Sequence, residues 1–242
     1  MNELTKIGKK HGTDKAGPNN YTEVSYYRLL KNKRNDKIKL LELGVGDTGA
    51  SVKMWREFFP NAEITLFDPF FITHPDVTVT KEELEALNIN VVVGNQLDKN
   101  DLSKLEAYGE YDIIIDDASH LSDGIQLSFA VLFPYLKKGG LYIVEDLSCA
   151  HDRDKRINDV NNWLDSENVN QNIQKIYHRK EIHISHALRE YKDTSKWNST
   201  FLLEKQKKYL EDNIDTFMIV PNYNNTEGLA VIKKNKAMVS SY

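Results

Sequence analysis

Carboxylate side chains follow two apolar segments of the chain, at the points where each segment ends. Asp116 and Asp117 end the run YDIIIDD, and Glu145 and Asp146 lie near the end of LYIVEDL. If these segments are neighbouring parallel strands, about 4.8 Å apart, the four acids share one edge of a sheet. Like charges at that spacing either take up protons or surround a cation. Oxygen ligands without a nearby thiolate favour Mg²⁺ or Mn²⁺ over Zn²⁺.

A histidine accompanies these acids, because His120 lies three residues after Asp117 in the loop that leaves the same edge. An imidazole near a cation-bound hydroxyl can accept its proton, so His120 is the candidate general base, with a structural histidine as the alternative. Successive residues of a strand face opposite sides, so not all four acids are expected to reach one ion. Some of them could instead only cap the following helices. Three further histidines lack the acids that would complete a ligand set, namely His178, His183 and His186.

A glycine-rich stretch, LELGVGDTGAS, carries Gly44, Gly46 and Gly49 at G-x-G-x-x-G spacing, between an expected strand and an expected helix. Glycines there let the backbone approach a ligand at the carboxyl end of the first strand. Asp68 ends the second strand, where a carboxylate can accept both hydroxyls of an adenosine ribose. Glu42 would repel the pyrophosphate of NAD but suits the cationic sulfonium of S-adenosylmethionine. The loop therefore favours S-adenosylmethionine, with a purely structural turn as the alternative.

The elements that must position these residues follow from the hydrophobic pattern. Short apolar runs without alternation are typical of strands buried on both faces, and the amphipathic segments between them are typical of crossover helices. We expect strands at 38–44, 62–68, 89–94, 111–117 and 141–147. Residues 214–222 and 228–234 flank the turn-forming YNNTE and predict a closing antiparallel hairpin. The predicted fold class is α/β, a Rossmann-like, doubly wound, mostly parallel sheet with this hairpin and a helical insertion after strand five.

Composition limits the class of protein. The 242 residues, 40% of them hydrophobic, are enough to bury a sizeable core. The 32 Lys+Arg against 36 Asp+Glu give a net charge of -4, without the basic excess that nucleic acid binding requires. The single cysteine, Cys149, excludes an internal disulfide framework and a Cys-based zinc site. No segment is apolar enough for a membrane span or a signal peptide, so we expect a cytoplasmic protein with neither nucleic acid nor membrane as partner. A homodimer is considered, although no residue specifies the oligomeric state.

Several stretches together resemble a known family, the class I S-adenosylmethionine-dependent methyltransferases of the macrolide-sugar O-methyltransferase type. They are LELGVGDTGASVKMWREFFP, YDIIIDDASH, SFAVLFPYLKKGGLYIVEDL and the early GTDK at 12–15. The resemblance covers residues 12 to about 149 and implies S-adenosylmethionine and Mg²⁺, or Mn²⁺, as cofactors. It also implies a sugar-containing small molecule as the substrate. One departure is Asn19, which stands where the family usually has a histidine, and this concerns the active-site lid and the substrate.

The resemblance also implies residue roles. Metal ligation falls to Asp117, Glu145 and Asp146, with His120 as general base. The residues expected at the cofactor are Glu42, Gly44, Gly46, Asp68, Asn95, Gln96 and Asp116, with Asn95 or Gln96 approaching the adenine. Asp116 is also the first alternative base.

We expect one methyltransferase domain over residues 1–242. Its parts are an N-terminal helical cap (1–37), a cofactor-binding core (38–149), a helical lid or insertion (150–213) and a closing hairpin (214–242). Within enzymes, methylation of a catechol or phenol is the first alternative, but residues 150–213 are rich in Asn, Asp, Lys and Arg, which suits a hydroxylated or charged substrate. An NAD-dependent oxidoreductase is supported only by the glycine spacing. A protein that binds S-adenosylmethionine without catalysis is the alternative from a different class.

Overall fold

The structure is a computed structural model that describes residues 1–70, 77–147, 184–199, 202–221 and 227–235. Several expected features lie outside the described residues, namely Cys149, His178, His183, most of the expected turn at 223–227 and much of the expected lid. The side chain of His186 lies outside them as well.

In the described ranges of the chain, seven strands form one sheet in the order β3-β2-β1-β4-β5-β7-β6. The strands are β1 (Lys39–Leu43), β2 (Glu63–Asp68), β3 (Ile89–Val93), β4 (Tyr111–Asp116), β5 (Leu136–Val144), β6 (Ile214–Pro221) and β7 (Glu227–Lys234). Strands β1 to β5 pair in parallel, whereas β7 is antiparallel to both β5 and β6. This confirms the expected doubly wound sheet with its closing hairpin. The strand order reverses between β1 and β4, the position at which open α/β sheets bind ligands.

Strand β5 is the largest departure from the expected boundaries. It begins at Leu136, not at 141, because the segment KKGG continues the strand although its composition is typical of a turn. Gly139 takes a φ of 80°, and the β4–β5 register shifts between Tyr111 and Ile113. A glycine and an irregular register together let the strand continue through KKGG, where the sequence alone predicts a turn.

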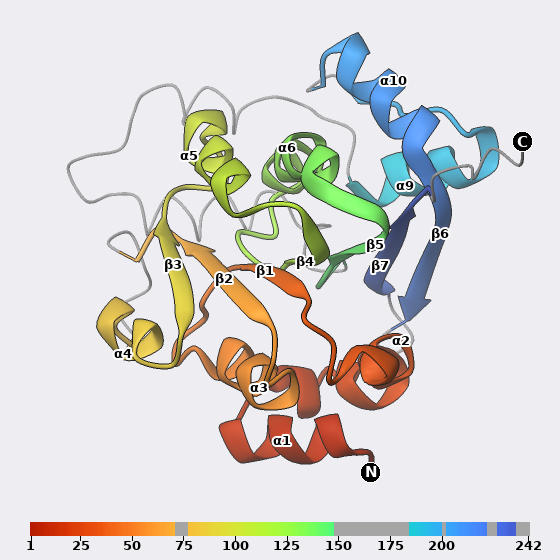
Figure 1. The fold of residues 1–242 in the computed structure, drawn as a ribbon. Coiled ribbons are helices and arrows are strands. Elements are labelled where there is room, and N and C mark those ends of the chain that lie inside the picture. The colour runs from red at the N-terminus through yellow and green to blue at the C-terminus, as the bar shows by residue number, and fades with distance from the viewer. Residues whose placement is uncertain (71–76, 148–183, 200–201, 222–226, 236–242) are drawn as a thin grey trace, which may run out of the picture.

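Helices cover both faces of this sheet (Figure 1). They are α1 (Glu3–His11), α2 (Tyr27–Leu30), α3 (Ala50–Phe58), α4 (Lys81–Glu85), α5 (Lys99–Ser103), α6 (Ser122–Leu132), α9 (Ile184–Thr194) and α10 (Glu204–Asn213). Buried residues of α1 to α4 share one core and those of α5, α6, α9 and α10 share the other. In the part of the chain that the structure describes, no helix combines the length and apolarity needed to cross a membrane.

The alternation of side chains along each strand decides which core a residue joins. Leu40 of β1 packs in the core beneath α3 with Trp55, whereas Leu41 packs in the core beneath α6 with Phe129. A strand places every second residue on the same face. Glu42 therefore lies on the α3 face, where it contacts Trp55.

The N-terminal segment crosses the α3 face and reaches the carboxyl edge of the sheet. Asn2 caps α1 by accepting from the backbone of Thr5, and Gly12 ends the helix in the left-handed conformation, with a φ of 79°. Lys10 and His11 bind Glu57 of α3 at 2.7 and 2.8 Å. These contacts fix α1 beside α3, so the chain from Thr13 onward continues over the ends of β1, β4 and β5.

Candidate active site

Three polar side chains meet at the carboxyl edge of β4 and β5. Asp117, His120 and Asp146 each offer a ligand atom, and these atoms all lie within 4.8 Å of one another. The Nε2 of His120 lies 3.7 Å from Oδ1 of Asp117. His120 and Asp146 have φ angles of 54° and 52°, a conformation that is costly outside glycine and is frequent at functional sites. The two carboxylates offer hard oxygen ligands for a divalent cation, and the imidazole beside them offers a nitrogen that can accept a proton.

The N-terminal segment contributes a buried lysine to this edge. Lys15 is fully buried, and its Nζ donates to Oδ2 of Asp117 and lies 2.9 Å from Oε1 of Glu145 and 4.0 Å from Oε1 of Glu42. Burial disfavours the ammonium form, but the three carboxylates outweigh burial and hold the pKa of Lys15 well above its usual value. Lys15 is therefore a fixed positive charge among the acids.

Two tyrosines from the same segment bind the other acids of the edge. The hydroxyl of Tyr26 donates to Oε1 of Glu145 at 2.5 Å, and the hydroxyl of Tyr21 donates to Oδ1 of Asp146 at 2.7 Å. Asn19, at the position where the sequence departs from the resembled family, donates to the same Oδ1 at 3.5 Å. Residues 15–26 thus contact Asp117, Glu145 and Asp146, the three expected metal ligands.

Glu145 is placed differently from the other two. It is buried, and among the described residues both its tyrosine and its lysine partner contact Oε1, not Oε2. Burial raises the pKa of Glu145, whereas Lys15 acts in the opposite direction.

Asp116 and Gln96 lie on the opposite face of the sheet, in contact with the α6 side. Asp116 accepts from Gln96 at 2.7 Å, from Tyr142 at 3.1 Å and from Ser128. The other end of the Gln96 amide accepts from Ser119 at 2.6 Å. Burial raises the pKa of Asp116 to about 7. Protein groups already bind both side chains, so the structure does not bring either residue to the acids around Lys15.

The glycine loop lies directly beside Asp117. A Cβ at Gly44, where φ is 97°, would lie 2.1 Å from the carbonyl oxygen of Asp117. Gly46 also has a positive φ, of 58°, but no atom lies within 4 Å of its Cβ position. Close packing thus requires the first glycine, and the second leaves open space for a ligand to approach the backbone.

Two acids flank the loop. Asp68, which is 7% exposed, accepts from the backbone of Val45 at 3.0 Å and of Phe70 at 2.7 Å. Burial raises the pKa of Glu42 to about 7, although Lys15 acts against this. Asn95, beyond β3, accepts from the backbone of Leu97 at 2.9 Å and closes its own turn. Asp68 therefore lies at the carboxyl end of β2 and Glu42 near the carboxyl end of β1.

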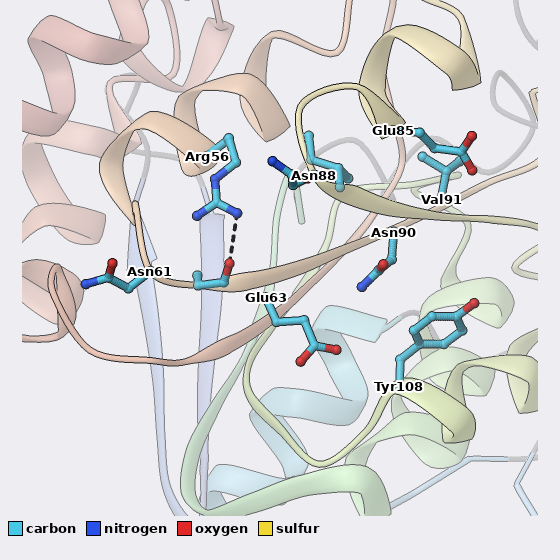
Figure 2. A pocket seen from close by; sticks show the side chains of 10 residues that line it. Arg56, Asn61, Glu63, Glu85, Asn88, Asn90, Val91 and Tyr108 are labelled. Atoms are coloured by element: carbon cyan, nitrogen blue, oxygen red, sulfur yellow. Dashed lines mark hydrogen bonds between the residues drawn. The ribbon is translucent and has the colours of Figure 1, made fainter.

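A hollow of about 560 Å³ lies at the other end of the sheet, where β2 and β3 begin (Figure 2). Its lining includes Asn61, Glu63, Glu85 and Asn90, and Figure 2 shows the guanidinium of Arg56 bonded to the backbone, a contact to the carbonyl of Ala62 at 2.8 Å. Its acids are exposed and bring no cluster of ligands together. The carboxyl edge is the stronger candidate site.

Sequence reasoning assigned no role to Lys15 or Tyr26. The signal for Lys15 was present, because a buried edge with four acids needs a compensating cation and GTDK contains a lysine. No local pattern indicates that this lysine crosses to residues more than a hundred positions away.

Comparisons with known proteins come from curated sequences and solved structures, since no family model matches the chain. The chain is 33% identical over 156 residues to mycinamicin VI 2''-O-methyltransferase of Micromonospora griseorubida. It is 35% identical over 158 residues to demethylmacrocin O-methyltransferase of Streptomyces fradiae. Each match covers 62% of this chain but 37% of the relative, so the chain matches little more than a third of those proteins. The resemblance stated from the sequence is confirmed.

A solved structure extends the similarity to the whole chain. MycE methyltransferase from the mycinamycin biosynthetic pathway, in complex with Mg and SAH, matches with a TM-score of 0.68 and 25% identity. The match covers 100% of this chain and 57% of that one. A second structure of the same protein also holds mycinamycin VI. The described sheet and helices have the Rossmann-like methyltransferase fold of that structure.

Proposed function

We propose that this chain, which has the class I S-adenosylmethionine-dependent methyltransferase fold and is related to the sugar O-methyltransferases of macrolide pathways, transfers a methyl group to a sugar hydroxyl. One observation carries the proposal: Asp117, His120 and Asp146 converge within 4.8 Å at the sheet edge, beside a glycine loop with open space. Carboxylates that can hold a cation and an imidazole that can accept a proton thus lie next to the space proposed for the methyl donor. Residues 1–37 act as the cap of this site.

The methyl donor occupies the crevice at the ends of β1 and β2. Gly44 and Gly46 let the donor contact the backbone of the loop. Asp68 binds the ribose hydroxyls through its two carboxylate oxygens, which the backbone N–H groups of Val45 and Phe70 hold in place. Glu42 supplies negative charge for the cationic end of the donor. The expected adenine contact belongs to Asn95 more than to Gln96, because both ends of the Gln96 amide are bound by protein groups.

The acceptor hydroxyl is oriented by the acid edge. Asp117, Glu145 and Asp146 would hold Mg²⁺ or Mn²⁺, and their hard oxygen atoms fit either ion. Such an ion, when bound, supplies positive charge that lowers the pKa of a sugar hydroxyl. His120 accepts the hydroxyl proton at its Nε2 as the oxygen attacks the methyl carbon. The new C–O bond forms while the C–S bond breaks, so the products are a methyl ether and S-adenosylhomocysteine.

Calorimetry and a metal assay test this function. S-Adenosylhomocysteine should bind in a 1:1 ratio while NAD gives no heat. Methyl transfer to glycosides should stop in EDTA and return with Mg²⁺ or Mn²⁺, with the affinity for S-adenosylhomocysteine unchanged by chelation. Tight NAD binding would contradict the proposal, and full activity after verified metal removal would contradict the role of the acids.

The class of methyl acceptor is tested separately, by comparing turnover of sugars and catechols. A panel of deoxysugar glycosides, nucleotide-linked sugars and catechols, each supplied with the same methyl donor, should give methylated sugars. Turnover of catechols without turnover of any sugar would favour the phenol alternative.

A further inference from the structure

The polar contacts of residues 15–26 share a pattern that the proposed function does not use. Lys15 binds Oδ2 of Asp117 and Oε1 of Glu145, whereas the partner of His120 is Oδ1 of Asp117. Tyr21 binds Oδ1 of Asp146. The segment thus takes one oxygen of each of the three acids. Among the described residues, Oε2 of Glu145 and Oδ2 of Asp146 have no partner, and Oδ1 of Asp117 has only His120, at 3.7 Å. A six-coordinate ion that shares its ligand sphere with substrate oxygens needs about one oxygen from each acid.

Lys15 is the charged member of this set. It is fully buried and contacts two of the acids directly, with a third, Glu42, at 4.0 Å. A buried carboxylate without a counter-charge is costly, so an internal cation lets the chain fold around these acids before any metal binds. The same positive charge repels a divalent ion held by the acids that it contacts.

We infer that Lys15 is a positioning residue of the metal site, an internal counter-cation that fixes which oxygens of Asp117 and Glu145 face the metal and that weakens metal binding. The inference rests on the metal site of the proposed function. It assigns Lys15 two opposite effects, since it stabilises the metal-free fold and lowers metal affinity. A residue with a merely structural role would not show this opposition.

The test is to measure Mn²⁺ affinity by calorimetry and metal-free thermal unfolding for Lys15→Met. We expect Mn²⁺ to bind at least ten-fold more tightly than in the wild type, because a positive charge in contact with two ligands is gone. The metal-free melting temperature should fall, and Mn²⁺ should raise it by more than in the wild type. Methyl transfer should decline, since Asp117 and Glu145 lose their fixed orientation. Lys15→Arg should keep Mn²⁺ affinity within about three-fold of the wild type, because the positive charge beside the acids is unchanged.

Lys10→Met is the matched control, because Lys10 lies in the preceding helix α1 but is exposed and binds only Glu57 among the described residues. It should leave Mn²⁺ affinity unchanged. If Lys15→Met does not fold, the comparison moves to Lys15→Met with Glu42→Gln against Glu42→Gln alone. In this pair no buried carboxylate at position 42 is left without a counter-charge. The double variant should bind Mn²⁺ more tightly than Glu42→Gln alone.

The outcomes separate the two proposals. Wild-type protein that binds no Mn²⁺ would overturn the metal site of the proposed function, and with it the inference. Wild-type protein that binds Mn²⁺ with an affinity that Lys15→Met leaves unchanged or lowers would overturn the role of Lys15 alone.

Discussion

The acids at the carboxyl edge have different environments although they come from two short sequence motifs. Asp116 and Asp117 are adjacent, yet the first is held by Gln96, Ser128 and Tyr142 and the second by Lys15. Adjacent residues of a strand face opposite sides, so one motif supplies a buried hydrogen-bond centre and a site residue.

His120→Gln tests the proposed base. The variant should keep its fold and its affinity for S-adenosylhomocysteine, while kcat falls by about 10² to 10⁴, the range typical of a lost general base. Stopped assays measure kcat, and calorimetry measures the affinity for S-adenosylhomocysteine. A variant with near wild-type kcat would show that His120 only shapes the loop.

Asp116→Asn tests the pKa of the buried carboxyl. Burial raises that pKa to about 7, so the folded protein keeps the proton up to about pH 7. The unfolded chain loses it near pH 4, and the free energy of unfolding should therefore decrease as pH rises from about 4 to about 7. The full effect is a few kcal/mol, since one pKa unit corresponds to about 1.4 kcal/mol.

Urea unfolding at pH 5 and pH 7 measures this effect. The asparagine variant does not titrate, so its stability should decrease less over this interval than that of the wild type. The same decrease in both proteins would mean that Asp116 does not titrate there.

At the scale of elements, the loop from β1 to α3 combines a packing requirement with an open space. Gly44 approaches the backbone of Asp117, whereas Gly46 faces empty space, and both have positive φ angles. The loop therefore joins the ends of β1 and β4 and leaves its second glycine free for a ligand.

Gly44→Ala and Gly46→Ala form a matched pair. Both place an alanine in the left-handed region, which costs about 1 kcal/mol, but only the first also forces a carbon against backbone. Gly44→Ala should lose about 3 kcal/mol or more of stability and Gly46→Ala about 1 kcal/mol. Gly46→Ala should instead weaken S-adenosylhomocysteine binding. Chemical denaturation and calorimetry compare them, and equal stability losses would contradict the role of close packing.

At the scale of the whole molecule, a buried lysine ties the closing hairpin to the helical layer. Lys234 ends β7, and its Nζ donates to the carbonyls of Phe133, Pro134 and Leu136 at 3.0, 2.8 and 2.7 Å. These carbonyls follow α6, where helix carbonyls lack helical partners. The C-terminal end of the described chain is thereby held against the turn that leads into β5.

Lys234→Met should lower the free energy of unfolding by about 2 to 4 kcal/mol, because three carbonyls lose their donor. Lys233→Met is the control, since Lys233 is partly exposed and its ion pair with Asp215, at 3.3 Å, is a surface pair worth less than about 1 kcal/mol. Urea denaturation of both variants provides the comparison. Similar losses would show that the three contacts add little.

The sequence by itself determined the sheet, the closing hairpin, the glycine loop and the edge at which Asp117 and Asp146 gather. These features follow from the hydrophobic periodicity of each segment and from the polar residues directly after each apolar run, which are local properties. Only the tertiary structure decided that Lys15 is buried among the acids, that Tyr26 binds Glu145 and that Asp116 belongs to the other face. Lys15 meets Asp117 across 102 positions, and Tyr26 meets Glu145 across 119. Such partners are chosen by the packing of α1 on α3, which carries the segment over the edge, and no local pattern encodes that packing.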